Sequence, residues 1–266
     1  MQIIIDDLLT NYQIFGKKGA NILILPGWKR NSIEWQSCAQ ELSDKNRVIL
    51  LDLPGFGITQ KPKDSWDIFK YSDFVKDFLT KVQIKNPIIL GHSFGGRIGI
   101  IMASQSFPID QLVLVDAAGI EKKNMWLKFK VVMAKILKPI IPKSIISNLL
   151  KGDYAESGEM KEIFKKVISQ DLVNLLPKIK VPTTIIWGEQ DKILPLSHAK
   201  ILHDKIQNSR LRIVWGAAHD PHLERREQFL EILEDFLTPV IPAISHRPES
   251  GNPELGRVLD PRSGRG

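Results

Sequence analysis

Short, largely apolar runs alternate along the chain with stretches whose apolar residues are spaced three and four apart. The runs lie at 21–25, 47–51, 88–90, 112–115, 183–187 and 211–215, and the helically spaced stretches at 31–42, 71–82, 94–105, 197–206 and 223–237. Strands that are apolar on both faces are typical of parallel sheets covered by helices on both sides. The pattern therefore predicts an α/β fold with a mostly parallel, doubly wound sheet.

Local signals refine the ends of two of these elements. A β-prone run at 12–15 is separated from the run at 21–25 by Gly16 and Gly19, a pattern typical of a hairpin. We therefore expect a hairpin that leads into the first buried strand. In the stretch at 71–82, Ser72 is placed to cap the helix.

The alternation is interrupted for about sixty residues after Gly119. Helical patches at 126–137, 144–150, 159–169 and 171–175 follow one another there without an intervening strand, and prolines and glycines divide them. We interpret residues 119–180 as a helical cap inserted between two parts of one core domain, 1–118 and 181–238. Residues 239–266 hold few apolar side chains, so we expect a disordered tail, with a binding tail as the alternative.

Composition narrows the class of protein. The chain has 266 residues, 43% of them hydrophobic, which is enough for a sizeable core. No apolar run approaches the roughly 20 residues that a membrane span needs, and the first residues lack a basic leader region, so we expect a cytoplasmic protein. The single cysteine, Cys38, excludes an intrachain disulfide, and no Cys/His cluster has zinc-ligand spacing. We expect no metal and no cofactor.

The net charge of +7 is concentrated in the predicted cap. Residues 119–180 hold thirteen lysines, no arginine and six acidic residues, so the rest of the chain is balanced. Arginine is the usual partner of bases and phosphates, and its absence here argues against nucleic-acid binding. We favour a solvated lysine surface. The alternative is attraction to acidic substrates or weak contact with an anionic membrane surface.

The segment Gly91-His92-Ser93-Phe94-Gly95 stands between a predicted strand and a predicted helix. A Gly-x-Ser-x-Gly motif in this setting makes a sharp turn that exposes the serine hydroxyl, and the following helix directs its positive end toward that hydroxyl. Ser93 is therefore the candidate nucleophile.

A serine nucleophile needs a base, and the base needs an orienting acid. Of six histidines, His219 and His222 follow the last predicted strand, at the sheet edge that also carries the serine. We expect the other four to be structural or surface residues, namely His92, His198, His203 and His246.

Taken in chain order, these motifs resemble the α/β-hydrolase superfamily over about residues 12–237. The resemblance implies that His219 is the catalytic base, with His222 as the alternative. It implies that Asp191, in the loop after the penultimate strand, is the acid. Asp116, at the end of the strand before the cap, is the alternative acid, and Glu189 is a weaker candidate.

The resemblance also implies two backbone donors for an oxyanion. One is the N–H of Phe94, which follows the nucleophile, and the other is the N–H of Trp28, after Pro26-Gly27. Pro26 stands where the family usually has histidine, and Ala218 stands where it commonly has glycine.

The activity that this resemblance implies is hydrolysis of a carboxylic ester, thioester or lactone of a small molecule through an acyl-enzyme, without a cofactor. Apolar cap residues at 126–136 would supply an acyl pocket. Carbon–carbon bond hydrolysis and cofactor-free haloperoxidase-like chemistry are alternatives on the same triad, and a non-catalytic binding protein is a third. Dehalogenases and epoxide hydrolases need a carboxylate nucleophile, which Ser93 is not. Oligomeric state is left open.

Overall fold

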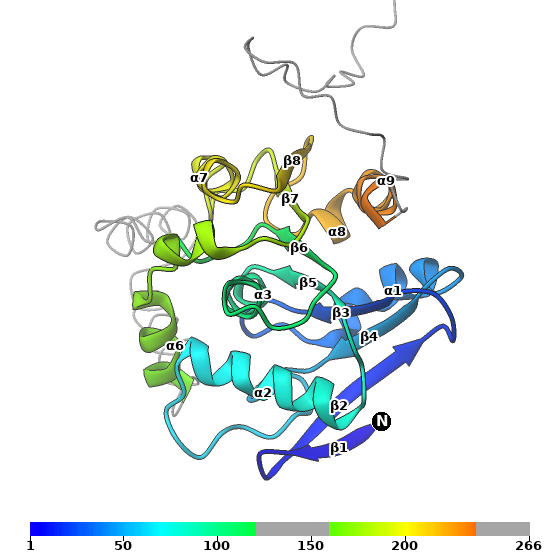
Figure 1. Ribbon diagram of the computed structural model, residues 1–266, viewed down its shortest axis with the longest axis vertical. Helices are drawn as coiled ribbons and strands as arrows, with labels where there is room; N and C mark the ends of the chain where they lie inside the picture. The colour runs from blue at the N-terminus through cyan, green and yellow to red at the C-terminus, as the bar shows by residue number, and fades with distance from the viewer. Residues whose placement is uncertain (121–159, 238–266) are drawn as a thin grey trace, which may run out of the picture.

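The computed structural model describes residues 1–120 and 160–237. Their strands form one eight-stranded sheet in the order β1-β2-β4-β3-β5-β6-β7-β8 (Figure 1). The six strands β3 to β8 run parallel to one another. Strand β2 pairs antiparallel with β4, and β1 pairs antiparallel with β2. The predicted mostly parallel sheet is therefore confirmed. The strands are β1 (Gln2–Ile5), β2 (Leu8–Phe15), β3 (Asn21–Leu25), β4 (Arg47–Leu51), β5 (Ile88–His92), β6 (Gln111–Val115), β7 (Thr183–Gly188) and β8 (Ser209–Val214).

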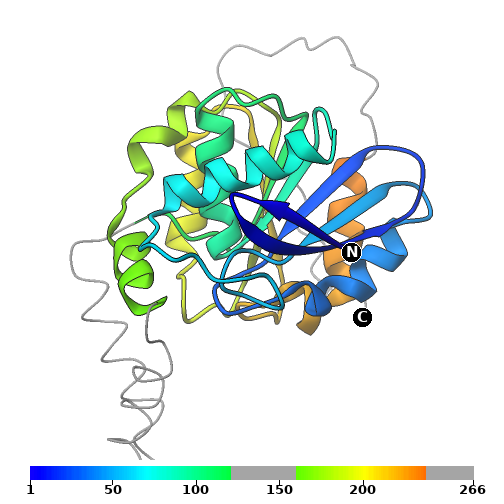
Figure 2. The same cartoon turned by 90° about the horizontal axis from the view of Figure 1, so that it is seen from below.

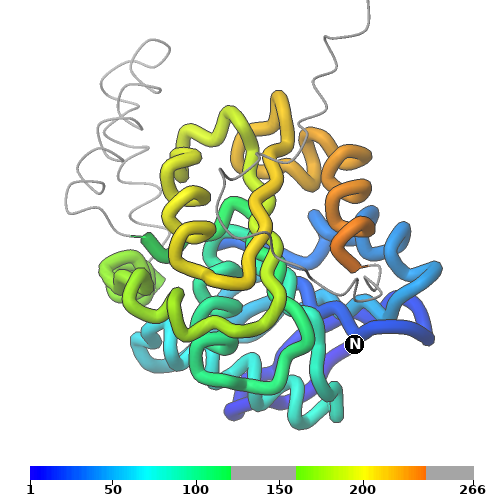
Figure 3. Tube along the Cα trace, turned by 45° about the horizontal axis from the view of Figure 1, so that its top comes forward, coloured from blue at the N-terminus to red at the C-terminus, as the bar shows by residue number. Residues whose placement is uncertain are grey.

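Helices cover both faces of the sheet. One face packs against α1 and α9, which lie side by side although they come from opposite ends of the chain (Figure 3). The other face packs against α2, α3 and α7. The helices are α1 (Gln36–Leu42), α2 (Ile68–Lys81), α3 (Phe94–Ser104), α6 (Met160–Ser169), α7 (Ser197–Lys205), α8 (Pro221–Glu224) and α9 (Arg226–Leu237), with 3₁₀ turns η1 (Ser32–Trp35) and η2 (Val173–Lys178).

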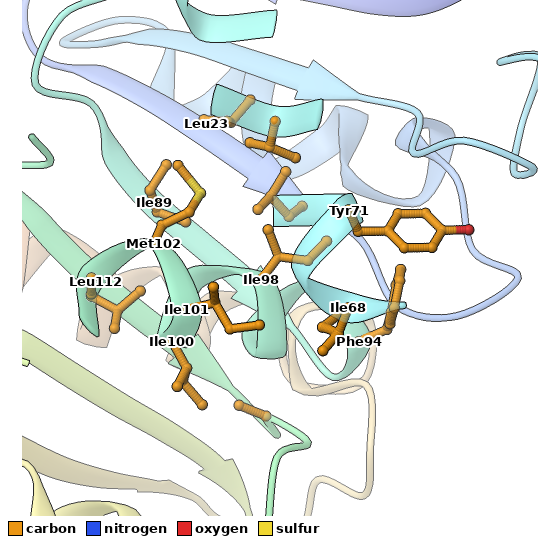
Figure 4. Packing of buried hydrophobic residues seen from close by; sticks show 14 of the residues in the cluster. Leu23, Ile68, Tyr71, Ile89, Phe94, Ile98, Ile100, Ile101, Met102 and Leu112 are labelled. Atoms are coloured by element: carbon orange, nitrogen blue, oxygen red, sulfur yellow. The ribbon is translucent and has the colours of Figure 1, made fainter. Parts of the chain in front are cut away.

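Helix α3 is the central element of the larger core because every one of its residues is buried. Figure 4 shows its side chains filling the space between the sheet and α2, with Phe94 and Ile98 near Ile68 and Tyr71. The rings of Tyr71 and Phe94 meet edge to face with centroids 5.0 Å apart. Helix α3 is therefore closely packed along its whole length, and this packing fixes the position of its N-terminus, which directly follows Ser93.

The expected hairpin of 12–15 with 21–25 is wrong. Strand β2 pairs with β1 on one side and with β4 on the other, and β3 lies between β4 and β5 (Figure 2). The actual hairpin joins β1 to β2 through Asp6 and Asp7, whose φ angles are 47° and 62°. The physical reason is burial: β3 is almost wholly buried and needs a strand on each side, whereas β1 is partly exposed at the sheet edge.

Three helix predictions also need correction. Helix α2 begins at Ile68 with Asp67 as its cap, since the Asp67 carboxylate accepts a hydrogen bond from the Lys70 N–H at 2.9 Å, and Ser72 is buried inside the helix. The stretch 223–237 is divided into α8 and α9. The patch at 171–175 is the 3₁₀ turn η2, which contains Pro177.

Part of the predicted organisation falls on residues outside the described ranges. The patches at 126–137 and 144–150 and the tail at 239–266 belong to this part, so the described residues of the predicted cap are 119, 120 and 160–180, which contain α6 and η2. Over residues 1–120 and 160–237, no helix combines the length and the apolar character that crossing a membrane requires.

Candidate active site

Ser93 occupies a strained turn between β5 and α3. Its φ and ψ are 48° and −105°, a conformation that a residue with a side chain adopts only when the surrounding structure enforces it. A Cβ atom on Gly91 would lie 2.5 Å from the Gly95 carbonyl oxygen, and one on Gly95 would lie 2.1 Å from the Leu25 carbonyl oxygen. Both positions therefore require glycine, and the half-buried Ser93 stands at the carboxyl edge of the sheet.

His219 and Asp191 form a hydrogen-bonded pair at the same edge. The distance from His219 Nδ1 to Asp191 Oδ2 is 2.7 Å, and the Asp191 side chain is fully buried. The other carboxylate oxygen, Oδ1, accepts hydrogen bonds from the N–H groups of Ile193 and Leu194 at 2.7 and 2.9 Å. This aspartate turn, formed within four residues of sequence, orients the carboxylate toward His219.

The pKa of Asp191 lies below its ordinary value. Burial is the strongest influence and by itself raises the pKa, but the hydrogen bond to His219, the charge of that ring and the Leu194 N–H together outweigh it. Asp191 is therefore a carboxylate that holds a proton on Nδ1 of the His219 ring and leaves Nε2 as the free acceptor.

The loops that carry Asp191 and His219 approach each other closely. A Cβ atom on Gly188 would lie 1.8 Å from the Ala218 carbonyl oxygen, so only glycine permits this approach. The Gln190 N–H donates to the carbonyl oxygen of Ala217 at 2.8 Å. On the other side, the Glu224 carboxylate accepts hydrogen bonds from the N–H groups that flank His219 along the chain.

His92 connects the serine turn to the histidine loop. Its Nε2 lies 2.9 Å from the His219 carbonyl oxygen, and its ring centroid lies 5.1 Å from that of His219. Burial, with repulsion from His219, lowers the pKa of His92 to about 3. The ring is neutral at physiological pH, so Nε2–H is the donor to this carbonyl.

A second connection runs from the Trp28 loop to the histidine loop. The Arg30 guanidinium donates to the Asp220 carboxylate at 2.7 Å and to the Glu34 carboxylate at 3.1 Å. Arg30 and Asp220 are 190 residues apart in sequence, and no local motif pointed to their pairing. The sequence predicted a structural or surface role for His92, but it indicated neither the contact of His92 with His219 nor this ion pair.

Trp28 and Phe94, the expected oxyanion donors, lie next to each other. Their rings meet edge to face with centroids 5.1 Å apart, and the Trp28 ring also contacts Phe56 at 4.8 Å and Phe164 of α6 at 5.0 Å. Within residues 1–120 and 160–237, neither backbone N–H has a hydrogen-bond acceptor. We call Trp28, Phe56, Phe94 and Phe164 the aromatic cluster.

The alternative candidates are placed differently. Glu189 accepts a hydrogen bond from the Gly216 N–H at 3.0 Å, and its carboxylate does not reach the histidine pair. His222 is fully buried and stacks on Trp35 with centroids 3.8 Å apart. Asp116, however, lies beside the pair: one ligand atom each of Asp116, Asp191 and His219 lie within 4.8 Å of one another.

Among residues 1–120 and 160–237, two groups of side chains have the residue types of a metal site. One is the group just described, and the other contains His92, Asp220 and His222. In the second group the Arg30 guanidinium already binds the Asp220 carboxylate at 2.7 Å, and its positive charge opposes a cation there. In the first group, Asp191 binds the His219 ring. We therefore assign no metal to either group.

Comparisons with known proteins agree with this architecture. The model of the α/β hydrolase fold family matches residues 20–138. The uncharacterized hydrolase YugF of Bacillus subtilis is 27% identical over 263 residues, which cover 88% of this chain and 96% of that protein. The monoacylglycerol lipase ABHD6 of Mus musculus is 26% identical over 272 residues, which cover 88% of this chain and 81% of that protein.

Two solved structures show the same fold. A bacterial membrane phospholipase A superposes with a TM-score of 0.75 at 24% identity, covering 89% of this chain and 84% of that one. The enol-lactonase of Burkholderia xenovorans LB400 superposes with a TM-score of 0.72 at 20% identity, covering 90% and 100%. The family match over residues 20–138, the strand order and the glycine-bracketed turn together show that the chain has the α/β-hydrolase fold.

Proposed function

We propose that this chain is a serine hydrolase that cleaves a carboxylic ester with a small or medium apolar acyl group through an acyl-enzyme. The observation that carries the proposal is the 2.7 Å pair of His219 and Asp191 at the sheet edge where the glycine-bracketed turn presents Ser93. A nucleophile, a base and an orienting acid are the three groups that such chemistry needs.

In this mechanism, His219 Nε2 takes the proton of Ser93 Oγ as that oxygen attacks the ester carbonyl carbon. The tetrahedral intermediate collapses, and the imidazolium returns the proton to the departing alcohol. A water molecule then attacks the acyl-enzyme, with His219 again as the base, and the products are the free acid and the free Ser93 hydroxyl. Asp191 keeps the imidazole in the required tautomer and stabilises the imidazolium.

The oxyanion of each intermediate would bind the N–H groups of Trp28 and Phe94. Phe94 is the first residue of α3, so its N–H belongs to the unpaired donors at a helix N-terminus, where the dipole favours negative charge. One such donor changes a rate by about 10² to 10³ in comparable sites.

The aromatic cluster supports an apolar acyl group. Trp28 and Phe94 carry the proposed oxyanion donors on their backbones, and their rings pack with those of Phe56 and Phe164 into an apolar cluster next to those donors. The names of similar proteins, which include a lipase, a phospholipase and a lactonase, agree with ester chemistry. Lactones and thioesters would react through the same intermediates.

Covalent labelling tests the proposal directly. We expect a fluorophosphonate probe to label the wild-type chain, the Ser93→Ala variant to remain unlabelled, and the exposed control Ser169→Ala to be labelled normally. We then expect turnover of p-nitrophenyl esters across a series of acyl lengths. Labelling of the Ser93→Ala variant would overturn the nucleophile. A labelled wild-type protein that hydrolyses no ester of the series would overturn ester cleavage and favour carbon–carbon hydrolysis or haloperoxidase-like chemistry.

A further inference from the structure

Asp116 is held in an unusual backbone conformation beside the proposed triad. It follows the last residue of β6 with a φ of 40°, in the left-handed region that a side chain disfavours. Its N–H donates to the Ile186 carbonyl oxygen at 3.0 Å, and its Oδ1 accepts from the Gly188 N–H at 3.0 Å. Both contacts are to β7, so the carboxyl group faces the end of the strand that leads to Asp191.

The charges around this carboxyl group are unfavourable for a second anion. Asp116 is fully buried, and its carboxyl group lies within 4.8 Å of the Asp191 carboxylate and the His219 ring. Asp220 contributes further negative charge. Across the described ranges, Asp116 forms no salt bridge with lysine or arginine, and the neighbouring His219 ring is bound to Asp191. Two carboxylates so close together in a buried site do not both ionise.

The free oxygen of Asp116 agrees with this reading. Its Oδ2 atom is buried and accepts no hydrogen bond from an N–H or O–H group in the described part of the chain. Burial, and then the charge of Asp191, raise the pKa of Asp116 well above its usual range, whereas the Gly188 N–H lowers it by less. A protonated Oδ2 is a donor, and the Asp191 carboxylate is the acceptor close to it.

We propose that Asp116 is a neutral carboxylic acid whose O–H donates to the Asp191 carboxylate and keeps that carboxylate in the orientation that binds His219. This inference rests on the proposed function, in which Asp191 is the acid of the triad. Asp116 is a positioning residue, because it acts on Asp191 and does not touch the reacting atoms. The proton between the two carboxyl groups stays on Asp116 throughout the reaction. A hydrogen bond from a carboxylic acid to a carboxylate is among the stronger hydrogen bonds in proteins.

Infrared spectroscopy tests the protonation state without any activity. At neutral pH, the difference spectrum between wild type and Asp116→Asn is expected to contain the carbonyl stretch of a protonated carboxylic acid. The matched control Asp110→Asn, at an exposed position, is expected to lack this band. A spectrum for Asp116→Asn that shows only the loss of an ionised carboxylate would overturn the proposal, even if the protein hydrolysed no ester at all.

Kinetics with a conservative and a non-conservative variant test the positioning role. Asparagine keeps the acceptor for Gly188 and offers an N–H donor to Asp191, so Asp116→Asn is expected to retain kcat within about 3-fold. Alanine keeps neither group, so Asp116→Ala is expected to lower kcat by about 10-fold or more with KM nearly unchanged. Loss in Asp116→Asn as large as in Asp191→Asn would show that Asp116 is a required anion and overturn the proposal. An unchanged kcat in Asp116→Ala would overturn it as well.

Discussion

The Nε2 atom of His92 lies 2.9 Å from the backbone carbonyl oxygen of His219, so the residue before the proposed nucleophile is bound to the proposed base. These residues are 127 positions apart in sequence. This side-chain hydrogen bond is therefore one of the contacts that fix the distance between the histidine loop and the serine turn.

Removal of this link is expected to slow the reaction without preventing folding. In His92→Ala the histidine loop loses its attachment to the turn, and a displacement of about 1 Å can lower a rate by about 10²-fold. We expect kcat/KM for a p-nitrophenyl ester to fall by about 10- to 100-fold. The control is His203→Ala, since His203 is exposed on α7 and bonds to Ser209. Equal activities of the two variants would contradict the proposed role of His92.

The buried histidines predict a loss of stability in acid. The pKa of His92 falls to about 3 in the folded protein and that of His222 falls well below its usual value, in both cases mainly through burial. Below the unfolded pKa of about 6.5, the unfolded chain binds protons that the folded chain rejects. The stability that these two neutral histidines contribute is therefore fully present above about pH 6.5, and it is lost as the pH falls from there toward their folded pKa values.

Denaturant unfolding at a series of pH values checks this direction. Each buried histidine contributes a slope of at most about 1.4 kcal/mol per pH unit. His92→Asn is expected to be less stable than wild type at pH 8 but to lose stability less steeply between pH 6.5 and 4.5, whereas His203→Ala keeps the wild-type slope. An unchanged slope in His92→Asn would show that His92 is protonated in the folded state.

The two carboxylates of the loop after β7 are expected to respond very differently to neutralisation. Asp191→Asn loses the anion that holds the His219 tautomer, and comparable substitutions lower kcat by about 10⁴. Glu189→Gln keeps an acceptor for the Gly216 N–H, so we expect activity within about 3-fold of wild type. Turnover of a p-nitrophenyl ester by both variants at one pH measures the contrast. A larger loss in Glu189→Gln would reassign the acid.

The close approach at Gly188 predicts that one added methyl group pushes apart the loops that carry Asp191 and His219. In Gly188→Ala the new Cβ atom would lie 1.8 Å from the Ala218 carbonyl oxygen, which is backbone and has to move. We expect a lower Tm and a kcat reduced by at least about 10-fold. In the control Gly99→Ala, the new Cβ meets the end of the Leu112 side chain at 2.8 Å. This control is expected to alter Tm and to retain kcat, and a Gly188→Ala enzyme with full kcat would refute the prediction.

The aromatic cluster predicts a change of acyl preference when it is reduced. Phe164→Ala removes a ring whose centroid lies 5.0 Å from that of Trp28, and this opens space beside the aromatic cluster. We expect kcat/KM for longer acyl chains to rise by about 3- to 10-fold relative to acetate. Phe69→Ala, at an exposed position on α2, is the control. An unchanged ratio would place the acyl group elsewhere.

Much of the architecture follows from the sequence because it depends on local chemistry. The period of the apolar residues predicts strands and helices, and it places β3 to β8 within a few residues of their bounds. The turn at Ser93 is recognised because its geometry admits only glycine at 91 and 95. Asp191 is recognised only through family resemblance, although its turn is local.

Other features depend on contacts between distant segments, which periodicity does not encode. The pairing of β2 with β4 and the ion pair of Arg30 with Asp220 belong to this class. Asp116 and Asp191 are the same residue type at the ends of neighbouring strands, and the sequence could only rank them as acids. In the folded chain, hydrogen bonds to Asp191 lower its pKa, whereas burial and the nearby Asp191 charge raise the pKa of Asp116. The sequence does not show this difference, because ionisation depends on surroundings that exist only in the folded chain.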